Sequence, residues 1–156
     1  MTREEFEGLN ISIQVGVGCA PDDVQIDMWG GYNDYWRAQS EALQTFINQR
    51  DNSDSLTPEG LWDELSVIVD KARDIMWDHH EEIINDPPWD VPESKTSKGI
   101  DVIGTFPTEF AGSHFLATVH MLNYGDTATT MEQYLANLDE YLAFDCYIEL
   151  EEGETK

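Results

Sequence analysis

Residues 9–17 read LNISIQVGV, and this stretch decides the fold class because apolar and polar residues alternate strictly along it. The apolar positions are Leu9, Ile11, Ile13, Val15 and Val17. A period of two residues is typical of a strand that buries one of its faces. A second alternation, over residues 24–28 (VQIDM), follows the turn-forming residues 20–23 (APDD). We therefore expect an N-terminal β-hairpin.

After Gly30 and Gly31 the apolar spacing becomes helical. A first helix is expected to bury one side, made of Tyr32, Tyr35, Trp36, Leu43, Phe46 and Ile47. A second helix begins at residues 57–59 (TPE), with Thr57 as N-cap, Pro58 in the first turn and Leu56 packed on Leu61. The segment 85–88 (NDPP) is expected to end this helix, because proline cannot continue it.

The rest of the chain predicts three more strands and one more helix. A proline-rich connector, 87–99, precedes strands at 100–106 and 114–124, which a loop at 107–112 joins. A capping box of Thr129 and Glu132 opens a third helix, and a last strand at 146–150 leads into an acidic tail, 151–156, expected to be disordered. The order strand-strand-helix-helix-strand-strand-helix-strand predicts a single α+β domain over residues 1–156, with a largely antiparallel sheet and about three helices.

The chain is strongly acidic. Thirty-two Asp and Glu residues against eight Lys and Arg residues give a formal net charge of -24. Five Trp, six Tyr and six Phe residues are spread through the sequence, which disfavours a disordered acidic chain and places the charge on a folded surface. Self-repulsion of this size destabilises a folded protein. We therefore expect the charge to serve a purpose other than solubility.

The densest acidic region is the second predicted helix and its flanks. Residues 51–93 hold thirteen acidic and two basic residues. On a helical wheel one outward face collects Glu59, Asp63, Asp70, Asp74, Asp78 and Glu81. The row is about 33 Å long at 1.5 Å per residue, close to one turn of duplex DNA. Lys71 and Arg73 fall at about 80° to either side, so the centre of the row is expected to be bare.

A bare row of carboxylates predicts a basic protein partner, since complementary fields speed association and select partners. DNA-binding clefts are such surfaces, because they neutralise phosphates with Lys and Arg. The first hypothesis is therefore a DNA-mimic inhibitor of restriction, CRISPR or repair machinery. An immunity protein or antitoxin that neutralises a basic nuclease toxin is the alternative, and a small metal-dependent enzyme is a third. An acidic domain with no charge-dependent partner, as in a halophile, also stays open. Direct binding to nucleic acid is not expected.

Residues 70–82 (DKARDIMWDHHEE) pose the question of a metal or acid/base site. His79 and His80 are adjacent rather than one turn apart, so they do not form the pair of ligands that a zinc helix needs. His114 and His120 share one face of a predicted strand and are the other candidate ligands, together with His80. No motif for nucleotides, calcium or a catalytic serine is present. We therefore expect a non-enzyme with no cofactor and no metal.

The remaining expectations concern location and assembly. Cys19 and Cys146 form no Cys-x-x-Cys pair, which favours reduced, mostly buried thiols in a cytosolic protein. The N-terminal residues lack the apolar segment of a signal peptide, and no apolar run approaches the roughly 20 residues of a membrane span. We expect a cytoplasmic protein, in the host cytoplasm if a phage encodes it. Whether an apolar face supports a homodimer, and whether Trp29, Trp77 and Trp89 pack internally or serve an interface, stays open.

Overall fold

A computed structural model describes residues 1–18, 20, 24–28, 31–84, 102–125, 131–137 and 142–153 of the chain. Its elements run in the order α1 (Arg3–Glu7), β1 (Asn10–Val17), β2 (Gln25–Asp27), α2 (Asp34–Arg50), α3 (Pro58–Asp78), α4 (His80–Ile84), β3 (Val102–Phe110), β4 (Ser113–Gly125), α5 (Met131–Ala136) and β5 (Leu142–Glu152). The expected α+β class and element order are confirmed. Two short helices, α1 and α4, are added to the three that the sequence predicts.

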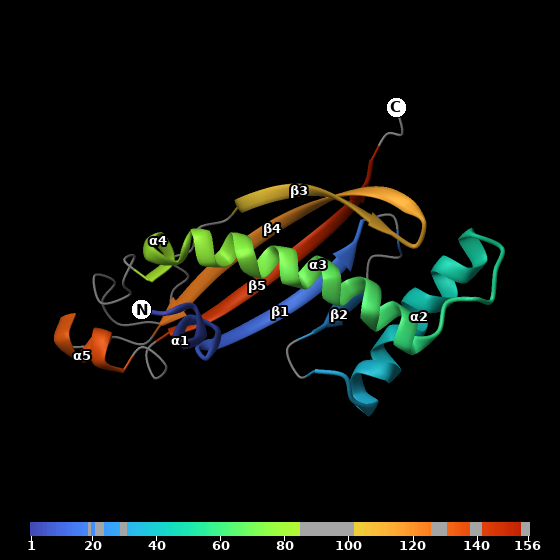
Figure 1. Ribbon diagram of the computed structural model, residues 1–156. Helices are drawn as coiled ribbons and strands as arrows, with labels where there is room; N and C mark the ends of the chain where they lie inside the picture. The colour runs from blue at the N-terminus through green and yellow to red at the C-terminus, as the bar shows by residue number, and fades with distance from the viewer. Residues whose placement is uncertain are drawn as a thin grey trace.

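All five strands form one sheet in the order β2-β1-β5-β4-β3. β5 lies at the centre, parallel to β1 and antiparallel to β4, and the pairs β1–β2 and β3–β4 are antiparallel hairpins. The sheet is thus largely antiparallel, as expected. The long helix α3 crosses one face of the sheet, and α2 lies beside β2 (Figure 1).

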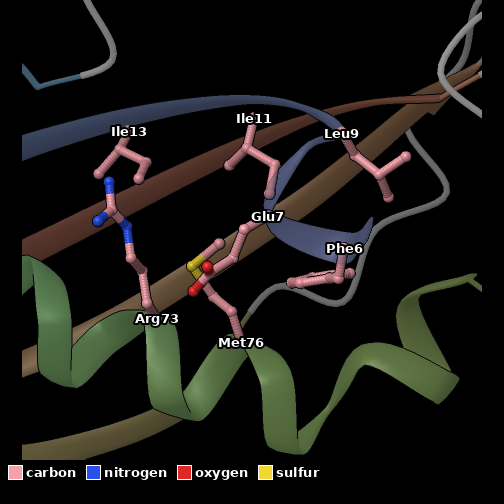
Figure 2. A pocket seen from close by; sticks show the side chains of 7 residues that line it. All are labelled: Phe6, Glu7, Leu9, Ile11, Ile13, Arg73 and Met76. Atoms are coloured by element: carbon pink, nitrogen blue, oxygen red, sulfur yellow. The ribbon is translucent and has the colours of Figure 1, made fainter. Parts of the chain in front are cut away.

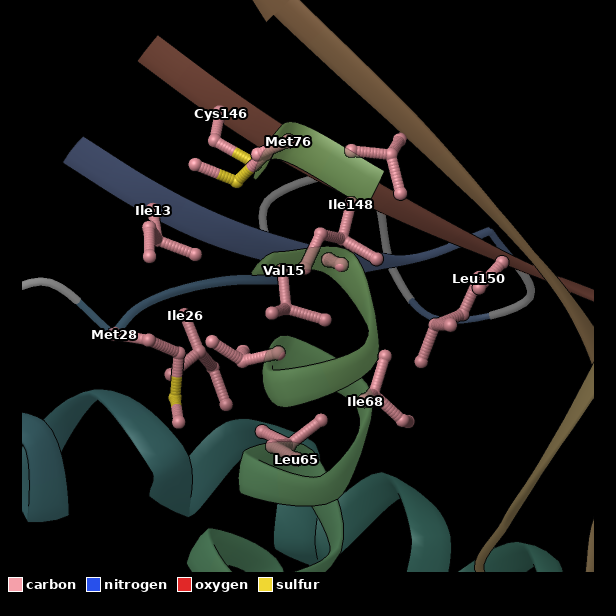
Figure 3. Packing of buried hydrophobic residues seen from close by; sticks show 14 of the residues in the cluster. Ile13, Val15, Ile26, Met28, Leu65, Ile68, Met76, Cys146, Ile148 and Leu150 are labelled. Carbon is pink, nitrogen blue, oxygen red and sulfur yellow. The ribbon is translucent and has the colours of Figure 1, made fainter. Parts of the chain in front are cut away.

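The hydrophobic core lies between this face of the sheet and the helices. Alternate residues of β1 and β5 point toward α3, where Val15 and Ile148 meet Leu65 and Ile68 (Figure 3). The buried residues of β1 and β5 form one continuous layer because the register places them side by side, as with Ile13 and Cys146 in this parallel pair. The other alternate residues of these strands are exposed or half-buried, except Gly16, which Tyr147 covers. We call this second surface of the sheet the open face.

The N-terminal helix α1 is absent from the sequence-based expectation. Thr2 caps it through a capping box with Glu5, and Phe6 is only 1% exposed. The Phe6 ring contacts Trp77 at 6.1 Å and Phe144 at 6.2 Å between ring centroids. One buried aromatic residue therefore anchors a five-residue helix that would be unstable alone.

The helix α2 begins later than the sequence analysis expects. Its N-cap is Asn33, whose side chain accepts a hydrogen bond from the Trp36 amide, so Tyr32 lies outside the helix. Tyr32 is 40% exposed and Tyr35 is 68% exposed, and their expected place on the buried side is wrong. The buried face runs through Trp36, Ser40, Leu43 and Ile47, and Tyr35 is about 100° away from Trp36 around the helix.

The helix α3 begins as predicted but ends early. Thr57 accepts a hydrogen bond from the Gly60 amide and Pro58 occupies the first turn, which confirms the predicted start. The helix ends at Asp78, and not near residue 84, because His79 leaves helical geometry at φ -107° and ψ 8°. Residues 80–84 form the separate helix α4, and the expected stop at 85–88 lies outside the described residues.

The hairpin β3–β4 is longer than expected. β3 continues through Pro107 to Phe110, and a tight turn at Ala111 and Gly112, with φ of 52° and 78°, replaces the predicted loop 107–112. Two successive residues at positive φ are typical of a two-residue hairpin turn. Proline is tolerated here because β3 is an edge strand and needs no amide donor on its free side.

The end of the chain also departs from expectation. The expectation of a disordered tail is wrong for Glu151 and Glu152, which belong to β5 because they pair with Leu116 and Phe115 of β4. Residues 154–156 of the expected tail lie outside the described part. The helix α5 starts close to the predicted position, but Thr129, its expected cap, is also outside that part.

Candidate functional site: the acidic face of α3

The six carboxylates singled out by the helical wheel are all exposed to solvent. Glu59, Asp63, Asp70, Asp74 and Asp78 belong to α3, and Glu81 belongs to α4. The opposite side of α3 is buried through Leu61, Leu65, Ile68, Val69, Ala72 and Met76. The division into a buried and an acidic side is therefore as predicted. We call the six residues the acidic stripe.

The acidic stripe is divided between two helices and does not lie on one continuous helix. From Glu59 to Asp78 the helix advances about 28 Å at 1.5 Å per residue. The expectation of a row of about 33 Å on one helix is wrong, because the break at His79 places Glu81 on the separate helix α4. A single helix therefore carries only five of the six carboxylates of the acidic stripe.

Two arginines of the described residues reach the centre of the stripe. The Arg3 guanidinium of α1 binds Asp74 at 2.5 Å and Glu7 at 3.2 Å, and Arg73 Nη1 lies 3.5 Å from Asp70. The expectation of a bare centre is therefore wrong, because α1 brings an arginine from a distant part of the sequence. Lys71 lies on the other flank, 5.8 Å from the centroid of the Phe106 ring.

The ends of the stripe differ from each other. At the N-terminal end the Tyr32 hydroxyl donates to Glu59 at 2.9 Å. Hydrogen bonding by its own backbone amide and by Tyr32 lowers the pKa of Glu59, which keeps it charged. Within the part of the chain that the structure describes, Asp63, Asp78 and Glu81 have no ion pair within 4.0 Å. These three residues are the exposed, unneutralised members.

The histidine pair beside the stripe has a structural role at the helix end. The Nδ1 of His79 donates to the Ile75 carbonyl at 3.0 Å, and the Nδ1 of His80 donates to the Trp77 carbonyl. The His80 ring stacks on Trp77 at 3.8 Å with an interplanar angle of 2°. Both side chains therefore cap or pack the end of α3 and point away from the stripe. Of the tryptophans left open by sequence, Trp77 packs internally; Trp29 and Trp89 lie outside the described residues.

The strand histidines are not brought to His80. His114 and His120 lie on the open face, where His114 Nδ1 is 3.8 Å from Glu109 and His120 Nε2 is 3.6 Å from Glu149. His80 is on the helical side of the sheet beside Phe6. Among the described residues, no group of three or more His, Cys, Asp or Glu side chains is arranged to hold a metal ion.

A cavity of about 340 Å³ lies between α1, β1 and α3 (Figure 2). Its lining is Phe6, Glu7, Leu9, Ile11, Ile13, Arg73 and Met76. The aliphatic and aromatic residues form its walls, and the Arg73 guanidinium extends toward Ile13. These described lining residues include no histidine, cysteine or serine, so they offer no nucleophile paired with a general base.

Cys146 is a free thiol in the core, and burial raises its pKa to about 12. It is therefore neutral at physiological pH, as expected for a buried structural cysteine. Cys19 lies outside the described residues. No helix in the described part of the chain combines the length and apolar character needed to cross a membrane.

Comparison with known proteins finds no matching family model, no matching curated protein and no matching solved structure.

Proposed function

We propose that the protein is a DNA-mimic inhibitor, which occupies the basic DNA-binding surface of a defence or DNA-processing protein with its acidic stripe. The observation that carries the proposal is a row of exposed carboxylates on a rigid helix whose other side is anchored in the core. Exposed like charges cost stability in the free protein, and a cationic partner relieves that cost on binding.

The spacing of the carboxylates on α3 is wider than the spacing of phosphates in DNA, so α3 alone reproduces only part of the charge of a DNA strand. Five carboxylates over about 28 Å give about one charge per 6 Å, whereas one DNA strand carries one charge per about 3.4 Å along the axis. The helix therefore offers roughly half the linear charge of a single strand. We infer that a cleft that spans duplex DNA engages further acids of this protein, beginning with Glu81 and Glu82 on the adjoining α4.

The same surface suits a basic nuclease toxin, so the partner's identity separates an inhibitor from an immunity protein. The two differ in what competes for the partner. Duplex DNA displaces a DNA mimic from a DNA-binding cleft, whereas an immunity protein bound away from the cleft leaves DNA binding unchanged.

The test is affinity capture from a lysate that contains defence nucleases, at about 50 and 500 mM NaCl, with duplex DNA as competitor. Two variants with the same change in net charge are compared. One replaces Asp63, Asp70 and Asp78 with Asn; the other replaces the exposed acids Glu41, Asp54 and Glu132 with Gln, Asn and Gln.

We expect salt-sensitive capture of a DNA-binding protein, which duplex DNA displaces. The first variant should capture at least tenfold less of this protein, and the second variant should capture as much as the wild type. Equal capture by the two variants, or capture insensitive to salt, would contradict the proposal.

A further inference from the structure

The open face of the sheet is the second strongly charged surface of the protein. Strand register sets Asp145, Tyr147 and Glu149 of β5 side by side with Ser12, Gln14 and Gly16 of β1. On the other flank the same three β5 residues lie beside Leu122, His120 and Thr118 of β4. The carboxylates of Asp145, Glu149 and Glu151 therefore follow the central strand of the sheet.

Among the described residues, this face carries negative charge without the arginines that lie close to the acidic stripe. Every lysine and arginine of the described residues lies on a helix: Arg3 on α1, Arg37 and Arg50 on α2, Lys71 and Arg73 on α3. On the open face the basic groups that meet carboxylates are His114 and His120, which contact Glu109 and Glu149. The described residues of the open face therefore include no lysine or arginine that could neutralise these carboxylates.

Apolar groups are exposed on the same face. Leu116 is 41% exposed beside Glu151, and Val102 is 50% exposed beside His120. Tyr147 lies across Gly16, where a Cβ would stand 2.3 Å from the tyrosine hydroxyl oxygen. Its ring therefore lies over β1, on the other side of the central strand β5 from Leu116 and Val102.

We propose that the open face binds a cationic amphipathic helix of a partner protein. Its lysine and arginine side chains would meet Asp145, Glu149 and Glu151, and its apolar side chains would cover Leu116 and Val102. Such a helix would pack on the sheet opposite α3 and complete a three-layer arrangement. A second copy of this chain does not fit, because carboxylates would face carboxylates, and nucleic acid is excluded for the same reason. The inference goes beyond the proposed function, since the open face and the stripe lie on different sides of the sheet.

The probe is a synthetic 14-residue helical peptide with leucine on one side and lysine on the other, and its affinity is measured by fluorescence anisotropy. The open-face variant replaces Asp145 with Asn and both Glu149 and Glu151 with Gln. Its matched control is the stripe variant D63N/D70N/D78N, which removes the same charge from the helical side. A third variant, Leu116→Ser, removes an exposed apolar group and no charge.

The open-face variant is expected to weaken peptide binding about tenfold and Leu116→Ser about threefold, with the stripe variant within twofold of the wild type. Amide chemical-shift changes on peptide addition should cluster on β4 and β5. Circular dichroism checks that each variant folds. Equal losses from the two charge variants, or unaltered binding by Leu116→Ser, would overturn the inference, because non-specific charge attraction would then explain the binding. The proposed function is judged separately, by whether the stripe variant loses a DNA-binding protein.

Discussion

Asp78 is the carboxylate whose removal should stabilise the free protein most clearly. It is the last residue of α3, where the helix dipole disfavours negative charge and no basic residue occupies the last turn. It also lies one turn from Asp74, which adds a like-charge pair at i,i+4. The dipole contributes about 0.3–1 kcal/mol and the pair about 0.2–0.5 kcal/mol. Because Arg3 already neutralises part of Asp74, we expect Asp78→Asn to raise the free energy of unfolding by about 0.5–1 kcal/mol at low salt.

The assay is urea unfolding followed by tryptophan fluorescence. With a slope of about 2 kcal/mol per M, the midpoint should rise by about 0.25–0.5 M without a change of slope. At 1 M NaCl, where the screening length falls to about 3 Å, most of this gain should vanish.

Glu41→Gln is the matched control, because it changes the net charge equally. Glu41 lies in the middle of α2, four residues after Arg37, so its removal loses an attraction and relieves no helix end. Its midpoint should stay unchanged or fall slightly. A destabilised Asp78→Asn protein, a gain that 1 M NaCl leaves intact, or an equal gain in the control would refute the reasoning that the stripe is held at a local cost in stability.

Three further predictions test the packing and the buried titratable groups. Gly104→Ala should lower the free energy of unfolding by about 1–3 kcal/mol, because the new Cβ would lie 2.8 Å from Ile75 Cγ2. In an Ile75→Ala background the same change should cost less stability. Equal losses of stability in the two backgrounds, measured by urea titration, would contradict this contact. In a Cys19→Ala variant, Cys146 should react with a thiol reagent at pH 8 only after unfolding, since burial raises its pKa to about 12; rapid labelling of the native protein would count against its burial. Burial raises the pKa of Glu64, so its charged form costs stability above that pKa and protonation removes the cost as the pH falls. Glu64→Gln should therefore raise the free energy of unfolding at pH 7 by less than about 1 kcal/mol, and this gain should disappear toward pH 4. A gain in stability that grows as the pH falls would contradict the raised pKa of Glu64.

Local sequence signals predicted the elements that have strong periodicity or clear caps. The alternation at residues 9–17 marks β1, and Thr57 with Pro58 marks the start of α3. Pro107 misled the prediction of a loop, because proline is compatible with an edge strand and the sequence does not reveal which strand is at the edge. The helix α1 is too short for a periodic signal, although the pair Thr2 and Glu5 carries the pattern of a capping box.

The candidate site shows the same division between local and non-local information. Exposure of the stripe follows from the helical period, so the wheel identifies it. The neutralisation of the stripe by Arg3 does not follow from the helical period, because Arg3 and Asp74 are 71 residues apart in sequence and meet only after α1 docks. The end of α3 at His79 was also missed, since residues 79–84 continue an acceptable helical pattern and contain no glycine or proline.

The central position of β5 has a consequence for the kinetics of folding. β1 pairs with a strand about 130 residues later in the chain, and the two hairpins, β1–β2 and β3–β4, are joined in the sheet only through that strand. Each hairpin can form locally, but their assembly requires closure of a loop that spans most of the chain, and such high contact order slows folding. Until β5 inserts, two long strand edges stay unpaired, so the partly folded chain is more prone to aggregation than the finished sheet.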